Sequence, residues 1–167
     1  MRDRLSVFLL SALSGCGGAG NMAPPAGAPS RAIEKALSET LDDFHLAAAR
    51  ADEERYFAHF AAEGVFLGTD AKERWTVPSF RAYAHPHFVK GKAWSFRATE
   101  RHWVVSARGD MAWFDELLET KNLGQARGSG VLVFRGEWLI AQYNLALVVP
   151  NERFKEVKAL LENPLKE

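Results

Sequence analysis

The chain has 167 residues, and its 21 basic and 21 acidic side chains give a formal charge of zero at pH 7. This length suits one domain, and a hydrophobic content of 47% is enough for a substantial core. The balanced charge argues against a general nucleic-acid binder, because such proteins neutralise many phosphates with lysine and arginine. The single cysteine excludes an internal disulfide and a cysteine-rich zinc site.

The first sixteen residues have the features of an export signal. Two arginines near the start precede a run of nine mostly apolar residues at 5–13. This run is far shorter than the roughly 20 residues of a membrane-spanning helix, but it fits the core of a signal peptide. The sequence LSGC at 13–16 resembles a bacterial lipobox, in which the cysteine is acylated. We therefore expect a signal peptide over 1–15 and lipidation at Cys16; the alternatives are a secretory signal with an incidental cysteine and a wrongly chosen start codon.

The stretch 16–30 is rich in glycine, alanine and proline and carries no charge. Such a composition buries too little apolar surface to fold, so this stretch is expected to be a flexible tether. The folded domain is then expected over 31–167. Acylation would anchor this domain in the bacterial cell envelope, facing the periplasm or the cell surface, and the membrane would be contacted through the anchor alone.

The first half of the folded part is predicted to be mainly helical. Apolar residues recur there at spacings of three and four, which is typical of helices with one buried face. The predicted helices run over 31–50, from Asp52 to Gly64 and over 78–88, with a short strand at 65–67. A proline suits the first turn of the last of these helices, whereas Pro86 would end or kink it.

From Trp94 onward the pattern changes to an alternation of apolar and polar residues, which indicates half-buried strands. Turn signals separate four predicted strands, over 94–106, 111–120, 125–134 and 137–149. A last helix is expected after Asn151, with its apolar residues facing inward. Helices followed by antiparallel strands indicate an α+β domain, in which helices pack on one face of a curved sheet.

Three stretches resemble a known family: DEERYF at 52–57, GTDAKERW at 68–75 and GEWLIAQY at 136–143. With the order of elements, they resemble the SnoaL-like branch of the nuclear-transport-factor-two-like superfamily over about 31–150. The resemblance implies a cone-shaped fold, with a strongly bent sheet around helices and a pocket at the open end. Superfamily members include isomerases, cyclases, dehydratases and epoxide hydrolases, and also binding and scaffold proteins. The fold alone therefore leaves the function open.

The register of the last hairpin predicts one wall of this pocket. If Arg135-Gly136 is a two-residue turn, Val131 pairs with Ile140. Alternation then gives one face that is apolar near the turn and polar at the other end, as expected for a pocket with a polar mouth. The polar end supplies the candidate ligand-binding residues Arg127, Ser129, Gln142 and Asn144.

The opposite face of this hairpin is more apolar than a solvated face should be, so we expect it to be covered. The C-terminal helix or the sheet of a second copy of the chain would both serve. Superfamily members often form dimers through their outer sheet face, so the resemblance favours a homodimer.

Acidic residues are the candidate catalysts. Asp115 and Glu116 are adjacent on one strand, so they must point to opposite faces. The small side chain of Ala112 suits a face covered by helices, which favours Glu116 as the pocket residue, with its pKa lowered by Arg127. Glu116 would then be a general acid or base; otherwise it is a structural ion-pair partner or a surface acid. Asp70 is the second candidate, either as a catalytic carboxylate or as a turn former.

Trp75 and Trp94 are the aromatic candidates for lining the pocket. The histidines are scattered, and the pair around Pro86 lacks an evident third metal ligand. His45 is expected to be a partly buried, hydrogen-bonded side chain. The sequence contains no nucleophile elbow, phosphate-binding loop or dinucleotide fingerprint. We therefore expect neither a metal nor a cofactor.

These patterns favour a lipid-anchored envelope domain that binds a small, largely apolar molecule. The first alternative is an isomerase, cyclase or hydrolase that uses a pocket carboxylate for acid–base catalysis. The second is a protein-interaction module that acts through the outer sheet face. The predicted polar mouth favours ligand binding or catalysis over the protein-interaction module.

Overall fold

The computed structural model describes residues 31–91, 93–121 and 124–163. The predicted signal peptide, Cys16 and the tether lie outside the described residues. The elements, in chain order, are α1 (Arg31–Ala49), α2 (Glu53–Ala58), β1 (Phe60–Leu67), β2 (Arg74–Thr76), α3 (Val77–Val89), β3 (Arg97–Val105), β4 (Met111–Thr120), β5 (Gly124–Phe134), β6 (Trp138–Leu147) and α4 (Phe154–Glu162), with a short 3-10 turn (Asn151–Arg153) before α4.

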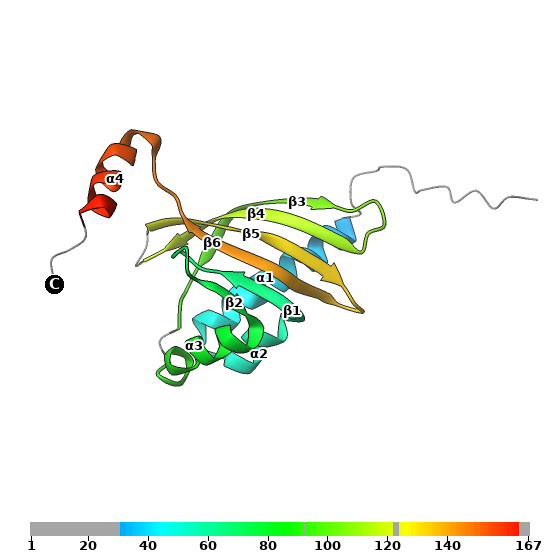
Figure 1. Ribbon diagram of the computed structural model, residues 1–167. Helices are drawn as coiled ribbons and strands as arrows, with labels where there is room; N and C mark the ends of the chain where they lie inside the picture. Colours follow the sequence, from blue (N-terminus) through cyan, green and yellow to red (C-terminus); the bar gives the residue numbers. More distant parts are fainter. Residues whose placement is uncertain (1–30, 92, 122–123, 164–167) are drawn as a thin grey trace, which may run out of the picture.

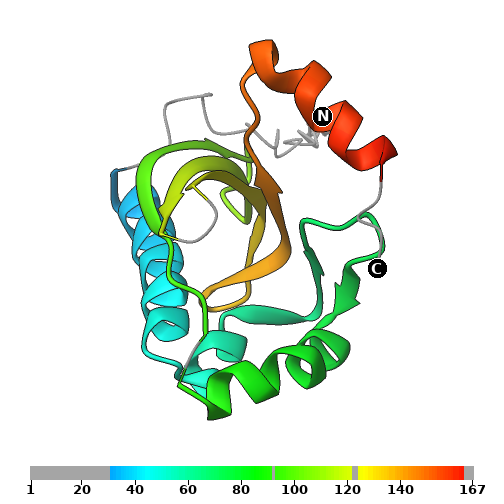
Figure 2. The same ribbon diagram turned by 90° about the vertical axis from the view of Figure 1, so that its left-hand side faces the viewer.

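The six strands form one sheet in the order β2-β1-β6-β5-β4-β3. All neighbouring strands are antiparallel except β1 and β6, which are parallel. The sheet is strongly curved, and α1 runs along its concave side while α2 and α3 lie at one end (Figures 1 and 2). The predicted α+β fold with helices on a curved, mainly antiparallel sheet is confirmed.

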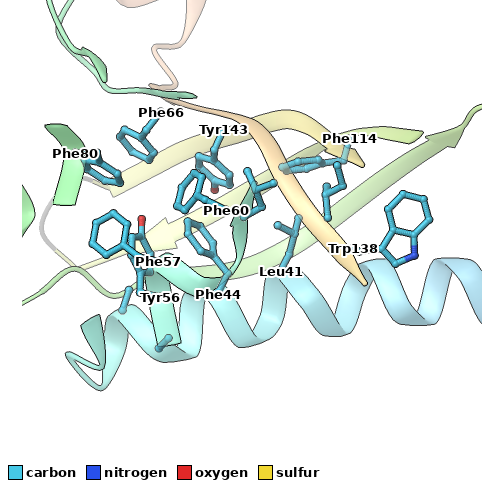
Figure 3. Close-up of a cluster of buried hydrophobic side chains, with 14 of the residues drawn as sticks. Leu41, Phe44, Tyr56, Phe57, Phe60, Phe66, Phe80, Phe114, Trp138 and Tyr143 are labelled. Carbon is cyan, nitrogen blue, oxygen red and sulfur yellow. The ribbon is translucent and has the colours of Figure 1, made fainter. Parts of the chain in front are cut away.

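The interior between α1 and the sheet is filled mainly by aromatic rings (Figure 3). Helix α1 contributes Leu37, Leu41, Phe44 and Ala48, the residues whose spacing predicted its buried face. The predicted inner stripe of the first helix is therefore confirmed.

Asp52 caps α2, because its carboxylate accepts a hydrogen bond from the backbone N–H of Arg55.

The second helix ends earlier than predicted. Helix α2 stops at Ala58, and Phe60 already begins β1, in which Phe60 pairs with Ile140 of β6. This pairing joins residues far apart in the sequence, so local periodicity could not reveal it. Gly64 lies inside β1, where a Cβ would approach the Ile140 carbonyl oxygen to 2.9 Å. Glycine at this position permits a close backbone approach and does not mark the end of a helix.

Helix α3 spans Val77–Val89, close to the predicted range of 78–88, and it continues through Pro86, so this proline does not end the helix. Pro86 lies in the last turn, where its missing N–H removes a single helical hydrogen bond.

The predicted register of the last hairpin is wrong. Phe134 pairs with Trp138, so the turn has three residues, and its central Gly136 has a φ of +91°. A β-bulge follows, because Leu132 pairs with Ile140 but Val131 pairs with Gln142. Neither the extra turn residue nor the bulge has a clear signal in the alternation of side chains.

This register reverses the predicted faces of β5 and of the part of β6 beyond the bulge, whereas Ile140 lies on the inner face as predicted. The inner face of β5 and β6 carries Gly128, Gly130, Leu132, Ile140 and Tyr143, all of them buried. The four predicted ligand-binding residues, Arg127, Ser129, Gln142 and Asn144, lie on the outer face instead. The pocket wall predicted from these four residues is therefore wrong.

Helix α4 stands away from the rest of the domain (Figure 1). None of its residues is buried, and Leu160 and Leu161 are 73% and 78% exposed. The expectation that its apolar side faces inward is therefore wrong. Within the described residues, no helix combines the length and the apolarity needed to cross a membrane.

Candidate functional site

A cavity of about 180 Å³ lies at the end of the sheet near α2 and α3. Helices α1, α2 and α3, strands β1, β2 and β6, and the segment before β3 all contribute to its wall. Nine of its thirteen lining residues are aromatic: Phe44, Tyr56, Phe66, Trp75, Phe80, Tyr83, Trp94, Phe96 and Tyr143. A wall of this composition suits an apolar or aromatic molecule.

The mouth of the cavity is more polar than its floor. Trp75 and Tyr83 stack there with ring centroids 5.1 Å apart, beside Thr69 and Glu73. Glu73 accepts a hydrogen bond of 3.2 Å from the backbone N–H of Asp70. Among the described lining residues, Glu73 is the single acidic one, and none is lysine, arginine or histidine.

Behind the floor of the cavity lies a buried carboxylate. The Tyr143 ring lines the cavity, and its hydroxyl donates a hydrogen bond of 2.8 Å to Oε1 of Glu116. Nε2 of His45, from α1, lies 2.8 Å from the same oxygen. Glu116 is completely buried and His45 is 6% exposed. The carboxylate therefore holds the Tyr143 ring in place from behind.

The second oxygen of Glu116 is bound by Arg101 of β3. Both Nε and Nη2 of Arg101 lie 2.8 Å from Oε2 of Glu116. The same guanidinium reaches α1, where Nη1 donates to Oδ1 of Asp42 at 2.9 Å. Three elements thus meet at one buried charge, which links α1 to both β3 and β6.

The electrostatic balance keeps Glu116 ionised. Burial by itself raises the pKa of Glu116, but the hydrogen bond from His45, the charges of His45 and Arg101, and the Tyr143 hydroxyl together hold this pKa below its ordinary value. Burial, followed by the neighbouring Glu116 charge, raises the pKa of Tyr143 well above its ordinary value. Tyr143 therefore remains a hydrogen-bond donor.

Gly128 of β5 makes room for this network. It pairs with Glu116 across the sheet. A Cβ at this position would lie 2.8 Å from Oε1 of Glu116 and would also collide with the Tyr143 hydroxyl. Glycine is needed here for the close approach of the two side chains.

The structure separates the two predicted acids. Glu116 points inward, as predicted, whereas Asp115 lies on the outer face. The predicted partner Arg127 is wrong, because Arg127 lies on the outer face and Arg101 pairs with Glu116 instead. Asp70 is exposed in a turn, where its Oδ1 accepts a hydrogen bond of 2.8 Å from the Lys72 backbone N–H.

Trp75 and Trp94 both line the cavity, in the position that the sequence predicted for them. Tyr56, Arg101 and Tyr143 were not among the predicted site residues. Arg101 shares the less exposed face of β3 with Trp103 and Val105, and this alternation is the signal that could have found it. His45 is buried and hydrogen-bonded, as its position beside Phe44 indicated, although its partner could not be identified from the sequence.

Residues 37–150 match the SnoaL-like domain family. The chain belongs to this family. The resemblance of the three sequence stretches is thus confirmed at the level of the domain. No protein of curated function matches the chain.

Solved structures with the same fold share little sequence with this SnoaL-like domain. A nuclear-transport-factor-two-like protein of unknown function from Pseudomonas putida is 15% identical, with a TM-score of 0.59, over 75% of this chain and 93% of that one. A domain of unknown function with a cystatin-like fold from Nostoc punctiforme is 16% identical, with a TM-score of 0.62, over 81% and 90% of the two chains. A proposed scytalone dehydratase from Novosphingobium aromaticivorans is 12% identical, with a TM-score of 0.59, over 71% and 85%. At these identities the likeness establishes the fold alone.

Proposed function

We propose that this SnoaL-like domain binds a small, largely apolar molecule in the aromatic cavity. The observation that carries the proposal is an open volume of about 180 Å³ in a core whose other rings are packed together. The cavity opens at the surface beside Thr69 and Tyr83, so a small molecule has a route to its aromatic wall. A dry cavity of about 150 Å³ can hold benzene. The ligand is therefore expected to contain one ring, or a chain of similar volume.

Binding is better supported than acid–base catalysis by Glu116. Both oxygens of Glu116 are engaged by His45, Tyr143 and Arg101, and Glu116 lies behind the cavity wall. A carboxylate whose pKa is lowered by such partners is a weak base. Asp70 lies outside the cavity lining. Glu116 and Asp70, the two acids predicted as catalysts, are therefore poorly arranged for proton transfer to a molecule in the cavity.

Native mass spectrometry of the full chain, purified from the cell that produces it, tests this proposal. We expect a reproducible bound mass. Leu145 lines the cavity, so Leu145→Trp should fill the space and abolish binding. Asn144→Trp is the matched control, because the neighbouring residue Asn144 lies on the outer face. Binding that is equal in the two variants, or a wild-type protein that binds neither a cellular molecule nor added small aromatics, would contradict the proposal.

We also propose that the domain is held at the cell envelope through a lipid on Cys16. The sequence over 13–16 supports this location. Detergent partitioning and the intact mass of the wild-type protein should show the lipid, and Cys16→Ala should lose both signals. A wild-type protein that stays in the aqueous phase with an unmodified mass would refute the anchor.

The outer sheet face supports a homodimer as a third proposal. Val104, Met111 and Trp113 are each between 43% and 48% exposed on β3 and β4. Val104 pairs with Trp113 and Trp113 pairs with Val131, so these side chains are neighbours across the strands. Sedimentation of the wild-type protein should give twice the mass of one chain, and the Trp113→Lys variant should give the mass of a single chain. A wild-type monomer at high concentration would exclude this proposal.

A further inference from the structure

The hydroxyl of Tyr56 is a buried donor without an acceptor. Tyr56 belongs to α2, lines the cavity and is completely shielded from water. Among the described residues, no acceptor lies in place for its proton. Burial raises the pKa of this hydroxyl and a hydrogen bond from the Trp94 side chain acts to lower it, but an indole N–H only donates and cannot accept the phenol proton. The O–H of Tyr56 therefore lacks an acceptor from the protein.

The ring of Tyr56 is fixed, so its hydroxyl has a defined direction. It stacks on Phe44 with centroids 4.4 Å apart and meets the edge of Trp94 at 5.6 Å. In Figure 3 the oxygen points away from α1, toward the side where Phe66 and Phe80 lie, two residues that also line the cavity. A buried polar group without a partner is rare in folded proteins and is a place where a ligand or a water molecule is needed.

We infer that the molecule bound in the cavity is neutral and carries a carbonyl-type oxygen, which accepts a hydrogen bond from the Tyr56 hydroxyl at the inner end. This inference rests on the proposed binding function and names the chemistry of its ligand. The ring or chain of the ligand fills the aromatic part of the cavity, while its oxygen supplies the missing acceptor.

The charges around the cavity exclude an anionic ligand. The described lining residues include no lysine, arginine or histidine that could balance a carboxylate or a phosphate. The acidic Glu73 at the mouth would repel such groups. Burial raises the pKa of Tyr56 well above its ordinary value, so this side chain keeps its proton and acts as a donor.

Three probes of nearly the same shape test the inference on the full chain. Acetophenone has a ring and a carbonyl, isopropylbenzene lacks the oxygen, and benzoate is an anion. Titration followed by tryptophan fluorescence is suitable because Trp75 and Trp94 line the cavity. We expect Tyr56→Phe to weaken acetophenone about tenfold, the upper range for one hydrogen bond, and to leave isopropylbenzene unchanged. Benzoate should bind more weakly than both.

Ser129→Ala is the matched control. It removes a hydroxyl on the outer face of the sheet, outside the cavity lining, so the affinity for neither neutral probe should change. A measurement on the wild-type protein keeps the test independent of the variants. The carbonyl stretch of bound acetophenone should shift to lower frequency, as expected for a hydrogen-bonded carbonyl.

The outcomes separate the two proposals. If both neutral probes bind, Tyr56→Phe affects neither and the carbonyl stretch is unshifted, the inference is wrong, the Tyr56 hydroxyl serves a buried water and the cavity remains a binding site. If no probe binds the wild-type protein, the proposed function fails for ligands of this class and the inference fails with it. Benzoate binding as tightly as acetophenone would overturn the charge argument.

Discussion

The hydroxyls of Tyr143 and Tyr56 lie in one aromatic core, in which Phe44 packs against both rings, yet their surroundings differ. The Tyr143 hydroxyl donates to a carboxylate, and every oxygen of that carboxylate is engaged. The Tyr56 hydroxyl has no acceptor among the described residues. On the sheet side, both oxygens of Glu116 are therefore engaged, and Arg101 Nη2 is held by the charge of Glu116 without a hydrogen bond of its own, whereas on the α2 side the proton of Tyr56 has no acceptor and leaves room for that of a ligand.

The polar network around Glu116, on the sheet side of the core, also explains how α1 is held on the sheet. His45 and Asp42 belong to α1, Glu116 to β4 and Arg101 to β3, so the network crosses from the helix to two strands. Removing one partner of such a pair leaves a buried charge without compensation, which is far more costly than losing an exposed pair. The variants below compare these two sides of the core in order of expected effect.

Arg101→Met should give the largest loss, about 3–5 kcal/mol of the free energy of unfolding, because Glu116 loses its cationic partner while it stays buried. Urea unfolding at pH 7 measures this loss. Arg97→Met is the control on the same strand, since Arg97 pairs with Glu119 in a largely exposed position and should cost about 0–1 kcal/mol. Equal losses in the two variants would mean that the buried pair gives no special stability.

Gly128→Ala should destabilise the domain by about 2–3 kcal/mol through overpacking. The added Cβ would displace the Glu116 carboxylate and the Tyr143 hydroxyl. Alanine is normally no worse than glycine inside a strand, so a loss points to this collision. Ser129→Ala, the next residue along β5 and on the outer face, should change the unfolding free energy by less than about 0.5 kcal/mol. A stable Gly128→Ala variant would show that the network can shift.

Tyr143→Phe should cost about 1–2 kcal/mol, since it removes one hydrogen bond to a charged group but keeps the ring and its packing. Thermal and urea unfolding both measure the loss. A neutral result would indicate that His45 and Arg101 alone satisfy Glu116, and the contrast between the two tyrosines would be weaker than the distances indicate.

The sheet side of the core, with the network around Glu116, was partly predictable from the sequence. The spacing on α1 and the alternation on β4 placed Phe44 and Glu116 inside, because each depends on local geometry alone. The partners of Glu116 were not predictable in the same way. Arg101 and Arg127 occur on neighbouring strands of Glu116, and only the register decides which of them points inward.

The α2 side of the core, which contains the cavity, was harder to predict for two physical reasons. The bulge opposite Val131 and Leu132 adds one residue, Ala141, to β6 and so reverses the face of the residues that follow, and alternation carries no information about it. The α2 side depends on the parallel pairing of Phe60 with Ile140, a contact that joins the two halves of the chain. Trp75 and Trp94 were predicted for the pocket as aromatic residues, and both line the cavity.

Acid should weaken the network around Glu116 by protonating its carboxylate without removing any side chain. Its effect on the free energy of unfolding should therefore be smaller than those of the substitutions above. Because the pKa of Glu116 is lower in the folded protein than its ordinary value of 4.5, the unfolded chain binds its proton first. This contribution to stability is present above pH 4.5 and is lost as the pH falls through the lower folded pKa. The difference in unfolding free energy between wild type and Glu116→Gln should therefore shrink below pH 4.5. A difference that stays constant down to pH 3 would assign the loss in the variant to packing.

Tyr56→Phe should have the smallest effect on stability and gives the clearest comparison with Tyr143→Phe. The change removes a hydroxyl that has no acceptor in the described protein, while the ring still stacks on Phe44. Removing an unpaired buried polar group is expected to be neutral or slightly stabilising, within about 0.5 kcal/mol. Thermal unfolding of the ligand-free protein measures this. A loss as large as that of Tyr143→Phe would mean that the Tyr56 hydroxyl is already satisfied in the folded protein by a bound water, and the α2 side would then be as complete as the sheet side.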